Sequence, residues 1–211
     1  IFVAFLLFLP VLFIFGYFQM VTLGFEKLGI SSEMTIFILL AILIGSAVNI
    51  PLTRKKLIYV RERKFFGLWH TPKIEVQGIA VNLGGAIIPV LLSLYFLFLI
   101  FKLGFELKPI LIATLLMIVI SKFLARVVPK RGISLPAIIP PVFSAIFAMI
   151  LAPEFAAPAA FISGTLGVLI GADVLSLPKI LGRDGGFISI GGAGVFDGIF
   201  LVGIISALLA Q

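Results

Sequence analysis

The sequence predicts an all-α protein, a polytopic bundle of about seven transmembrane helices, on three observations. Of its 211 residues, 62% are hydrophobic and 12% charged, which leaves too little polar surface to cover a soluble domain of this size. Apolar runs of about 20 residues, the length that crosses a hydrocarbon core of roughly 30 Å, recur along the chain. Basic residues gather in alternate connections between these runs, as the positive-inside rule requires. We therefore expect a multi-pass protein of the cell membrane.

The apolar runs place the spans in chain order. Prolines within or at the start of spans, among them Pro10, Pro89 and Pro140, predict kinks, because neighbouring groups can re-satisfy the freed carbonyls. No hydrophilic linker is long enough to hide a second domain, so residues 1–211 are expected to form a single transmembrane domain. The seven spans lie near Phe2–Leu23, Met34–Ile50, Ile79–Phe101, Ile110–Val128, Ala137–Leu151, Ala159–Leu181 and Gly192–Ala210.

The basic residues give this bundle a direction. Thirteen Lys and Arg residues fall on one side of the membrane and three, Lys27, Lys102 and Lys108, on the other. The richer side is the cytoplasmic one by the positive-inside rule, which puts both the N terminus and the C terminus outside. The same rule accounts for the net charge of +7, so no nucleic-acid partner is expected.

The loop 51–78 is the one substantial cytoplasmic element. It interleaves Arg61, Arg63 and Lys64 with aromatic residues such as Trp69, which indicates a surface for anionic lipid headgroups or for a cytoplasmic partner. A topology anchor whose aromatic rings rest at the membrane interface explains the same residues. His70 has no cysteine or second histidine beside it, so we expect no metal site and no cofactor.

Two acidic residues lie inside the last two spans. Asp173, in I-G-A-D-V-L-S-L, and Asp197, in G-G-A-G-V-F-D-G, are flanked by apolar residues, where an ionisable group costs about 2.5–3.5 kcal/mol or more. Asp173 precedes Gly182 by nine residues and lies roughly 13 Å deep, and Asp197 follows Gly192 by five and lies roughly 7–8 Å deep. Both fall in the cytoplasmic half, on antiparallel neighbours, so they are candidates for one catalytic pair.

Asparagines and glycines reach a similar depth. Asn49 closes the second span in A-V-N-I, and Asn82 opens the third in A-V-N-L, an echo on helices of opposite direction. With Gly192 and Gly194 they predict a polar, cytoplasmic-facing pocket that binds substrate. The glycine-rich segment before the seventh span lacks the lysine and spacing of a P-loop and is expected to be a flexible or short extended connector.

The aspartates permit three kinds of function. Two carboxylates that share a site do not both ionise easily, so one can activate water while the other, protonated, polarises a peptide carbonyl; this predicts hydrolysis of a transmembrane peptide. A proton- or cation-coupled carrier, or a protein that binds a small molecule or lipid, needs intramembrane acids of the same kind. In the third, the aspartates cap helix ends or accept hydrogen bonds from Ser and Asn, and the bundle only scaffolds partners or binds membrane lipids.

Two resemblances bear on this choice. The run from Gly192 to Asp197 is similar to the G-x-G-D signature of intramembrane aspartyl proteases, which implies Asp173 and Asp197 as catalytic residues, although Val195 and Phe196 separate the glycines from the acid. The motifs G-A-D-x-L and G-G-A-G-x-F-D-G, with V-N-I-P and V-N-L-G-G, more closely resemble a family of prokaryotic multi-pass membrane proteins, domain of unknown function 1614. That likeness spans most of the chain and implies no particular reaction.

Overall fold

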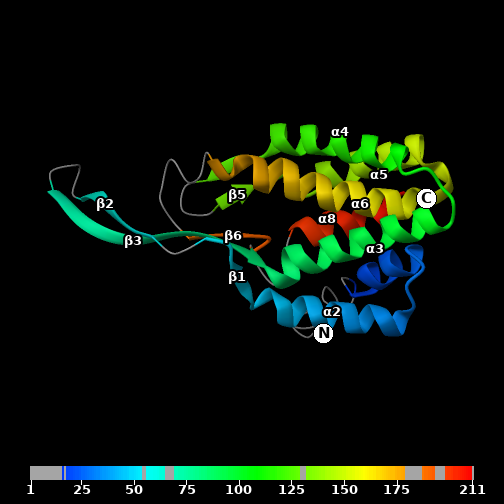
Figure 1. Cartoon of the computed structure of the whole chain (residues 1–211), viewed down its shortest axis with the longest axis horizontal. Helices are drawn as coiled ribbons and strands as arrows, with labels where there is room; N and C mark the ends of the chain where they lie inside the picture. Colours follow the sequence, from blue (N-terminus) through cyan, green and yellow to red (C-terminus); the bar gives the residue numbers. More distant parts are fainter. Residues whose placement is uncertain are drawn as a thin grey trace, which may run out of the picture.

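The fold is an elongated bundle of helices with a long β-hairpin that projects from one end (Figure 1). It is seen in a computed structural model that describes residues 16, 18–53, 56–64, 69–128, 132–178, 187–192 and 198–210. We call the end from which the hairpin projects the hairpin end, and the opposite end, where the C terminus lies, the far end.

The helical bundle that the sequence predicts is confirmed, because each apolar run from 18 onward contains a helix. The composition of these helices suits a membrane protein: Leu83–Lys102 and Pro153–Ser176 are each long and apolar enough to cross a bilayer, within the residues that the structure describes. A third span results if Phe18–Lys27 and α2, which meet at a bend of 119°, count as one. The helices are Phe18–Lys27, α2 (Ser32–Ser46), α3 (Ile88–Lys102), α4 (Lys108–Leu124), α5 (Ile139–Leu151), α6 (Ala156–Val168) and α8 (Gly198–Leu209).

The direction of the helices agrees with the pattern of basic residues. α2, α4 and α6 end at the hairpin end, whereas α3, α5 and α8 end at the far end (Figure 1). The connections to which the sequence assigns the thirteen basic residues therefore leave from one end of the bundle. The count of seven spans, and the side of the membrane on which the termini lie, stay predictions.

Local sequence explains where the helices begin. Ser31 caps α2, since its side chain accepts a hydrogen bond from the backbone N–H of Met34 at 3.4 Å. Prolines stand in the first turns of α3, α4 and α5, where a missing N–H costs nothing. Pro140 and Pro141 thus open α5 rather than kink it, and Pro10 lies outside the described residues.

A sheet, which the sequence did not predict, occupies the hairpin end. Its long strand β3 (Trp69–Asn82) pairs antiparallel with β2 (Lys56–Lys64) to form the hairpin and with β1 (Asn49–Pro51) at its base. The base of β3 also pairs, in parallel, with β6 (Phe187–Ile190), which confirms a short extended stretch before the last helix. A small ribbon, β4 (Arg126–Val128) with β5 (Gly132–Ser134), lies at the same end.

These strands correct three predicted span ends. The second span ends at Ser46 rather than Ile50, the third begins at Leu83 rather than Ile79, and the fourth ends at Leu124 rather than Val128. Hydropathy alone extended each span into apolar residues that pair as strands, since short apolar runs fit either structure.

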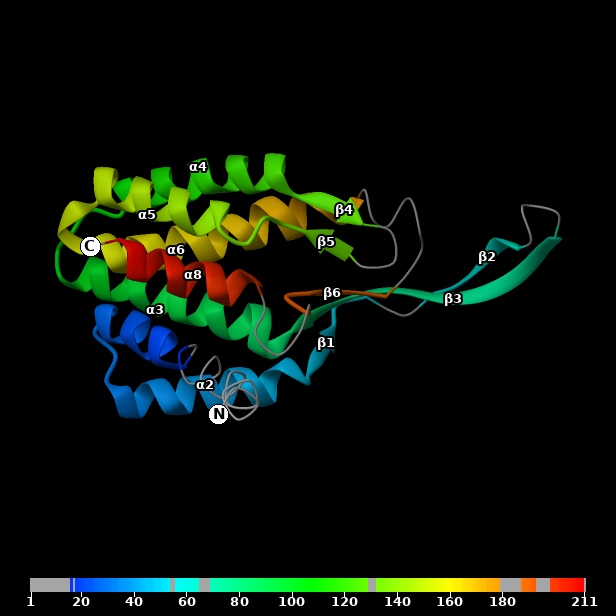
Figure 2. The same ribbon diagram turned by 180° about the vertical axis from the view of Figure 1, so that it is seen from behind.

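Two wide, π-helical turns lie at the hairpin end (Figure 2). η1 (Leu83–Ile87) joins β3 to α3, and η3 (Leu169–Asp173) continues α6 into the 3-10 turn η4 (Val174–Ser176). A further 3-10 turn, η2 (Pro153–Phe155), precedes α6 at the far end. Wide turns interrupt the regular helical ladder and occur often at functional sites.

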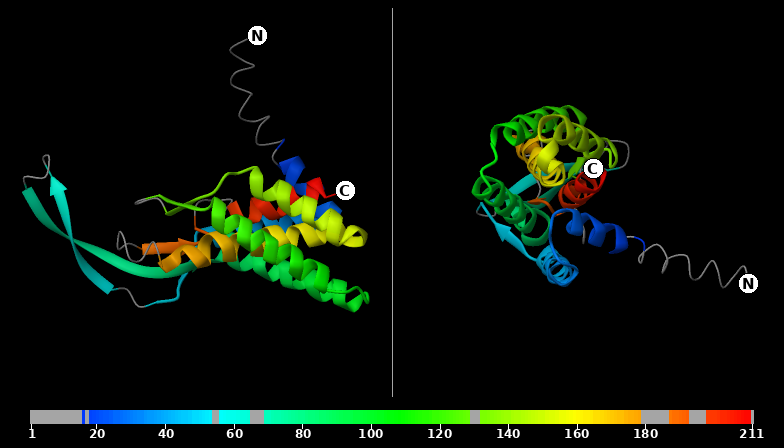
Figure 3. Two further views of the ribbon diagram at one scale, coloured as in Figure 1. Left: turned by 90° about the horizontal axis from the view of Figure 1, so that it is seen from above. Right: turned by 90° about the vertical axis from the view of Figure 1, so that its right-hand side faces the viewer.

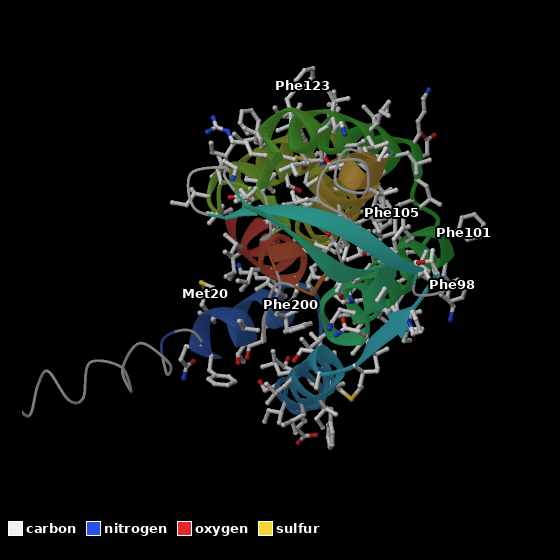
Figure 4. All side chains as sticks on the ribbon, turned by 90° about the vertical axis from the view of Figure 1, so that its left-hand side faces the viewer. Met20, Phe98, Phe101, Phe105, Phe123 and Phe200 are labelled. Atoms are coloured by element: carbon white, nitrogen blue, oxygen red, sulfur yellow. The ribbon has the colours of Figure 1, made fainter. Side chains whose placement is uncertain are left out.

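α6 is the central helix, and α3, α4, α5 and α8 pack around it (Figure 3). Ten of its 13 residues are buried, and its Phe161 ring meets Phe96 of α3 edge-on, with 5.5 Å between ring centroids. Outer faces are apolar instead: Phe98, Phe101 and Phe123 point away from the bundle (Figure 4) and are 62%, 66% and 84% exposed. Exposed phenylalanines around a buried central helix fit a bundle whose solvent is lipid.

Candidate functional site

Asp173 lies at the hairpin end of the central helix, as the last residue of η3, and is half-buried. The wide turn that carries it is pressed against α4. A Cβ on Gly171 would collide with the carbonyl oxygen of Ile118 and approach the Ser121 Cβ to 2.9 Å, so glycine is needed for this close approach. Close backbone packing against α4 therefore fixes the position of the turn that carries Asp173.

Lys122, from the last turn of α4, closes the helix end that follows Asp173. Its Nζ donates to the carbonyl oxygen of Leu175 and lies 3.5 Å from the Ser176 hydroxyl. A cation suits this position, because the last carbonyls of a helix lack partners and carry partial negative charge. The sequence analysis counted Lys122 only as a topology signal, because its contact with the end of the α6 segment depends on how two helices pack and cannot be read from one sequence.

The start of α8 packs against the turn that carries Asp173. Val168 and Ala172 of the α6 segment form one buried cluster with Ile199 and Val202 of α8. Asp197 lies outside the described residues, and α8 begins with the next residue, Gly198. The structure therefore brings together the residues that flank the two aspartates along the chain.

Asn49 and Asn82, predicted to share a level, are in contact. They are opposite partners in the β1–β3 pairing, and the Asn82 Nδ2 donates to the Asn49 Oδ1 at 3.1 Å and to the Ser46 carbonyl at 2.7 Å. The Asn82 Oδ1 accepts from the backbone N–H of Gly85 at 2.8 Å and so caps η1. Asn82 is 1% exposed, so its amide serves the fold; substrate binding by either residue stays a prediction.

Ser189, which the sequence analysis missed, extends this network to β6. Its hydroxyl donates to the Asn49 Oδ1, which links two segments that are 140 residues apart. Gly191 then turns the chain with a φ of +69°, and a Cβ there would lie 2.7 Å from the Cβ of Ala86 in η1. Of the predicted glycines, Gly192 follows this turn with its N–H donating to the Ser189 carbonyl at 3.2 Å, and Gly194 lies outside the described residues.

The residues predicted to contact lipid headgroups lie in the β2–β3 hairpin. In its register Arg61 pairs with Pro72, Arg63 with His70 and Lys64 with Trp69. Contact with lipid stays a prediction.

Among the described residues, no group of three or more His, Cys, Asp or Glu residues could hold a metal ion. The fold and the residues at its hairpin end define a helical membrane protein whose central helix ends in a wide turn that carries an aspartate. Residues 43–209 match the family described as protein of unknown function, DUF1614, and the chain belongs to this family. The predicted resemblance to that family is confirmed. No curated protein and no solved structure matches the chain.

Proposed function

We propose that Asp173 and Asp197 form a two-carboxylate site at the hairpin end that hydrolyses a transmembrane peptide. The observation that carries the proposal is the buried cluster of Val168, Ala172, Ile199 and Val202. Ala172 directly precedes Asp173, and Ile199 follows Asp197 by two residues. Helices in contact lie about 8–10 Å apart, a distance across which two carboxylates on facing turns can share a substrate.

The chemistry follows from two acids that share one proton. The ionised carboxylate takes a proton from water as the water oxygen attacks the carbonyl carbon of the peptide bond. The protonated carboxylate polarises that carbonyl and then supplies the proton that the departing nitrogen needs as the C–N bond breaks. The products are a carboxylic acid and an amine, and the pair returns to one shared proton.

Packing supports a rigid site. Gly171 fixes the Asp173 turn against α4, the Lys122 side chain binds the end of that turn, and Gly191, just after β6, packs closely against η1. Catalytic groups need positions held within about 0.5 Å, and elements fixed by close packing provide this better than loops do.

The test uses the full chain in liposomes with co-reconstituted single-span peptides labelled at both ends. Asp173→Asn and Asp197→Asn are each expected to lower cleavage to background. The one acid that remains in each variant cannot both activate water and polarise the carbonyl. Glu154→Gln is the matched control, since Glu154 is an exposed acid in η2 at the far end. Undiminished cleavage in either aspartate variant contradicts the proposal.

The two wide turns favour a second candidate, a proton- or cation-coupled carrier or small-molecule-binding protein that uses the same aspartates. Carriers bind ions where helices are interrupted within the membrane; η3 interrupts the α6 segment at Asp173, and η1 forms the first turn before α3 at the same end. Proton flux driven by a substrate gradient in liposomes distinguishes this function from hydrolysis. Flux that vanishes in Asp173→Asn without peptide cleavage in the unsubstituted protein would select the carrier.

A further inference from the structure

The β2–β3 hairpin extends beyond the helices of the bundle as a ribbon of two strands (Figures 1 and 2). Lys56 pairs with Gln77 at its base and Lys64 with Trp69 at its outer end, with no bulge between them. Eight steps of about 3.3 Å make a ribbon roughly 26 Å long. β6 pairs with β3 only at Gly78–Val81, so among the described residues no third strand pairs with this ribbon.

β1 and β2 lie along the same edge of β3. Leu52 and Thr53, which follow β1, both donate backbone hydrogen bonds to the carbonyl of Ile79, at 2.8 and 3.2 Å, and β2 continues the pairing from Lys56 onward. β6 pairs with residues of β3 that also pair with β1, so β6 occupies the opposite edge. We call the free side of β1 and β2 the outer edge, because no strand in the described part of the chain pairs with it.

The outer edge suits an added strand. A hairpin of two strands is marginally stable in water, and a third strand or a packed helix stabilises it. An uncovered edge also presents unpaired N–H and C=O groups that pair readily with another chain. β2 contains Ile58–Val60, residue types that favour strands, and none of its nine residues is proline or glycine. At the base of the same edge, Ile50 and Leu52 are 42% and 61% exposed.

The length of the ribbon favours a protein partner over the bilayer around the bundle. The helical segment Leu83–Lys102 has 20 residues, which at the helical rise cover about 30 Å, the thickness of the hydrocarbon core. Headgroups add about 5–8 Å on each side. A ribbon of roughly 26 Å that leaves the end of the bundle along its long axis (Figure 1) therefore has its outer half in water.

The charge of the ribbon defines the kind of partner. Five lysines and arginines stand against two glutamates, Glu62 and Glu75, which leaves a net charge of +3 over the described strands. Such a charge attracts an acidic segment and repels a basic one. The five cations are Lys56, Arg61, Arg63, Lys64 and Lys73.

We propose that the outer edge of the hairpin binds an extended, acidic segment of a partner protein, which adds as a third strand beside β2. Backbone hydrogen bonds hold the added strand, as in other cases of strand addition to a sheet edge. Glutamate or aspartate side chains of the segment complement the net positive charge of the ribbon. This surface is separate from the aspartate site, so the inference does not depend on the proposed hydrolysis.

Peptide binding to the full chain, held in nanodiscs of uncharged lipid, tests the proposal without changing the protein. The probe is a fluorescent peptide of alternating Glu and Val, about as long as β2. One comparison peptide has Pro in place of half of the valines, which keeps the charge and prevents strand pairing; the other has Lys in place of Glu. We expect fluorescence anisotropy to show binding of the probe, with a Kd at least about tenfold higher for either comparison peptide.

Absence of probe binding, or equal binding of the proline peptide, overturns the proposal. If the proline peptide binds equally and the protein also binds anionic vesicles, the hairpin recognises negative charge on a membrane surface instead of a strand.

Variants and hydrogen exchange locate the binding surface. Arg61→Gln with Arg63→Gln should raise the Kd of the probe about fivefold, because two exposed charge pairs are lost. Lys102→Gln with Lys108→Gln, a charge-matched control with exposed residues at the far end, should leave the Kd unchanged. The bound probe should also slow amide exchange in residues 56–64 and leave exchange in α5 unchanged. Equal effects of the two double variants, or unchanged exchange in residues 56–64, contradict binding at the outer edge.

Discussion

Asn82 and Asn49, which end the two A-V-N segments, are joined side chain to side chain at 3.1 Å. The contact links the end of α2 to the start of η1, and Ser189 adds β6 to it through the same Asn49 oxygen. Three segments far apart in the sequence therefore converge on one amide pair, which organises the hairpin end of the bundle.

Replacing Asn82 by alanine tests this relationship. The change removes two donated bonds and one accepted bond from a buried side chain, and we expect it to lower the free energy of unfolding by about 2 kcal/mol. Denaturant unfolding in detergent micelles measures the loss. Thr22→Val is the control, because the Thr22 hydroxyl bonds only to its own helix and its removal should cost less than about 0.5 kcal/mol. Equal stability of the two variants would show that the Asn82 network contributes nothing.

Gly84→Ala addresses the packing of α2 on η1. A Cβ at Gly84 would collide with the Ile42 carbonyl oxygen and lie 2.5 Å from the Ser46 nitrogen, atoms that cannot move without shifting the α2 backbone. Overpacking of this kind costs about 1–3 kcal/mol. Gly16→Ala, at a helical position with open space around it, should leave stability unchanged or slightly raised. Thermal unfolding compares the two, and a tolerant Gly84 would refute the close approach.

Lys122→Met separates helix capping from simple surface charge. Loss of the ammonium leaves the Leu175 carbonyl without its donor, and we expect a loss of about 1–2 kcal/mol, since charge-assisted bonds are the stronger ones. Lys102→Met removes an equivalent cation from the last turn of α3, where the side chain is exposed, and should cost no more than about 0.5 kcal/mol. Lys122→Arg should retain most of the stability. Identical losses at positions 122 and 102 would argue against the cap.

Two pairs of cations in the hairpin give a charge-matched test of lipid contact. Arg61→Gln with Arg63→Gln removes two cations that the sequence predicts to contact headgroups, and Lys56→Gln with Lys73→Gln removes two other cations of the same hairpin. If Arg61 and Arg63 meet anionic headgroups, the first pair should weaken binding of nanodisc-held protein to anionic vesicles by about 2 kcal/mol, near 1 per cation, and more at low salt. Equal weakening by both pairs would indicate a general charge effect.

Much of the bundle could be predicted from the sequence, because runs such as Ile139–Leu151 are apolar throughout and their length is set by the helical rise. The hairpin could not. Residues 56–82 mix cations with β-branched and aromatic residues, a pattern that an interfacial loop shares with a strand. The partnership of Asn49 with Asn82 was visible as a sequence echo, whereas Ser189 joins them only through the parallel pairing of β6 with β3, which no local pattern encodes.

The candidate site could likewise be predicted only in part from the sequence. An acid in an apolar run marks Asp173 and Asp197 in the sequence, since intramembrane acids are costly. The role of Lys122 depends on how α4 packs against the α6 segment. Gly171 sets that packing, because it lets the backbones of the two segments approach closely. Residue type alone does not reveal such a contact.

Cross-linking of the two aspartate positions tests the central proposal most directly, in a chain that has no cysteine of its own. The double variant Asp173→Cys with Asp197→Cys is oxidised in liposomes and compared with Gly164→Cys plus Ser206→Cys, a positive control on the same two helices, where a Cβ at 164 lies 2.8 Å from the Ser206 Oγ. Glu154→Cys with Asp197→Cys is the negative control. We expect disulfide formation in the aspartate pair and in the positive control; a disulfide in the positive control alone would contradict a shared two-carboxylate site.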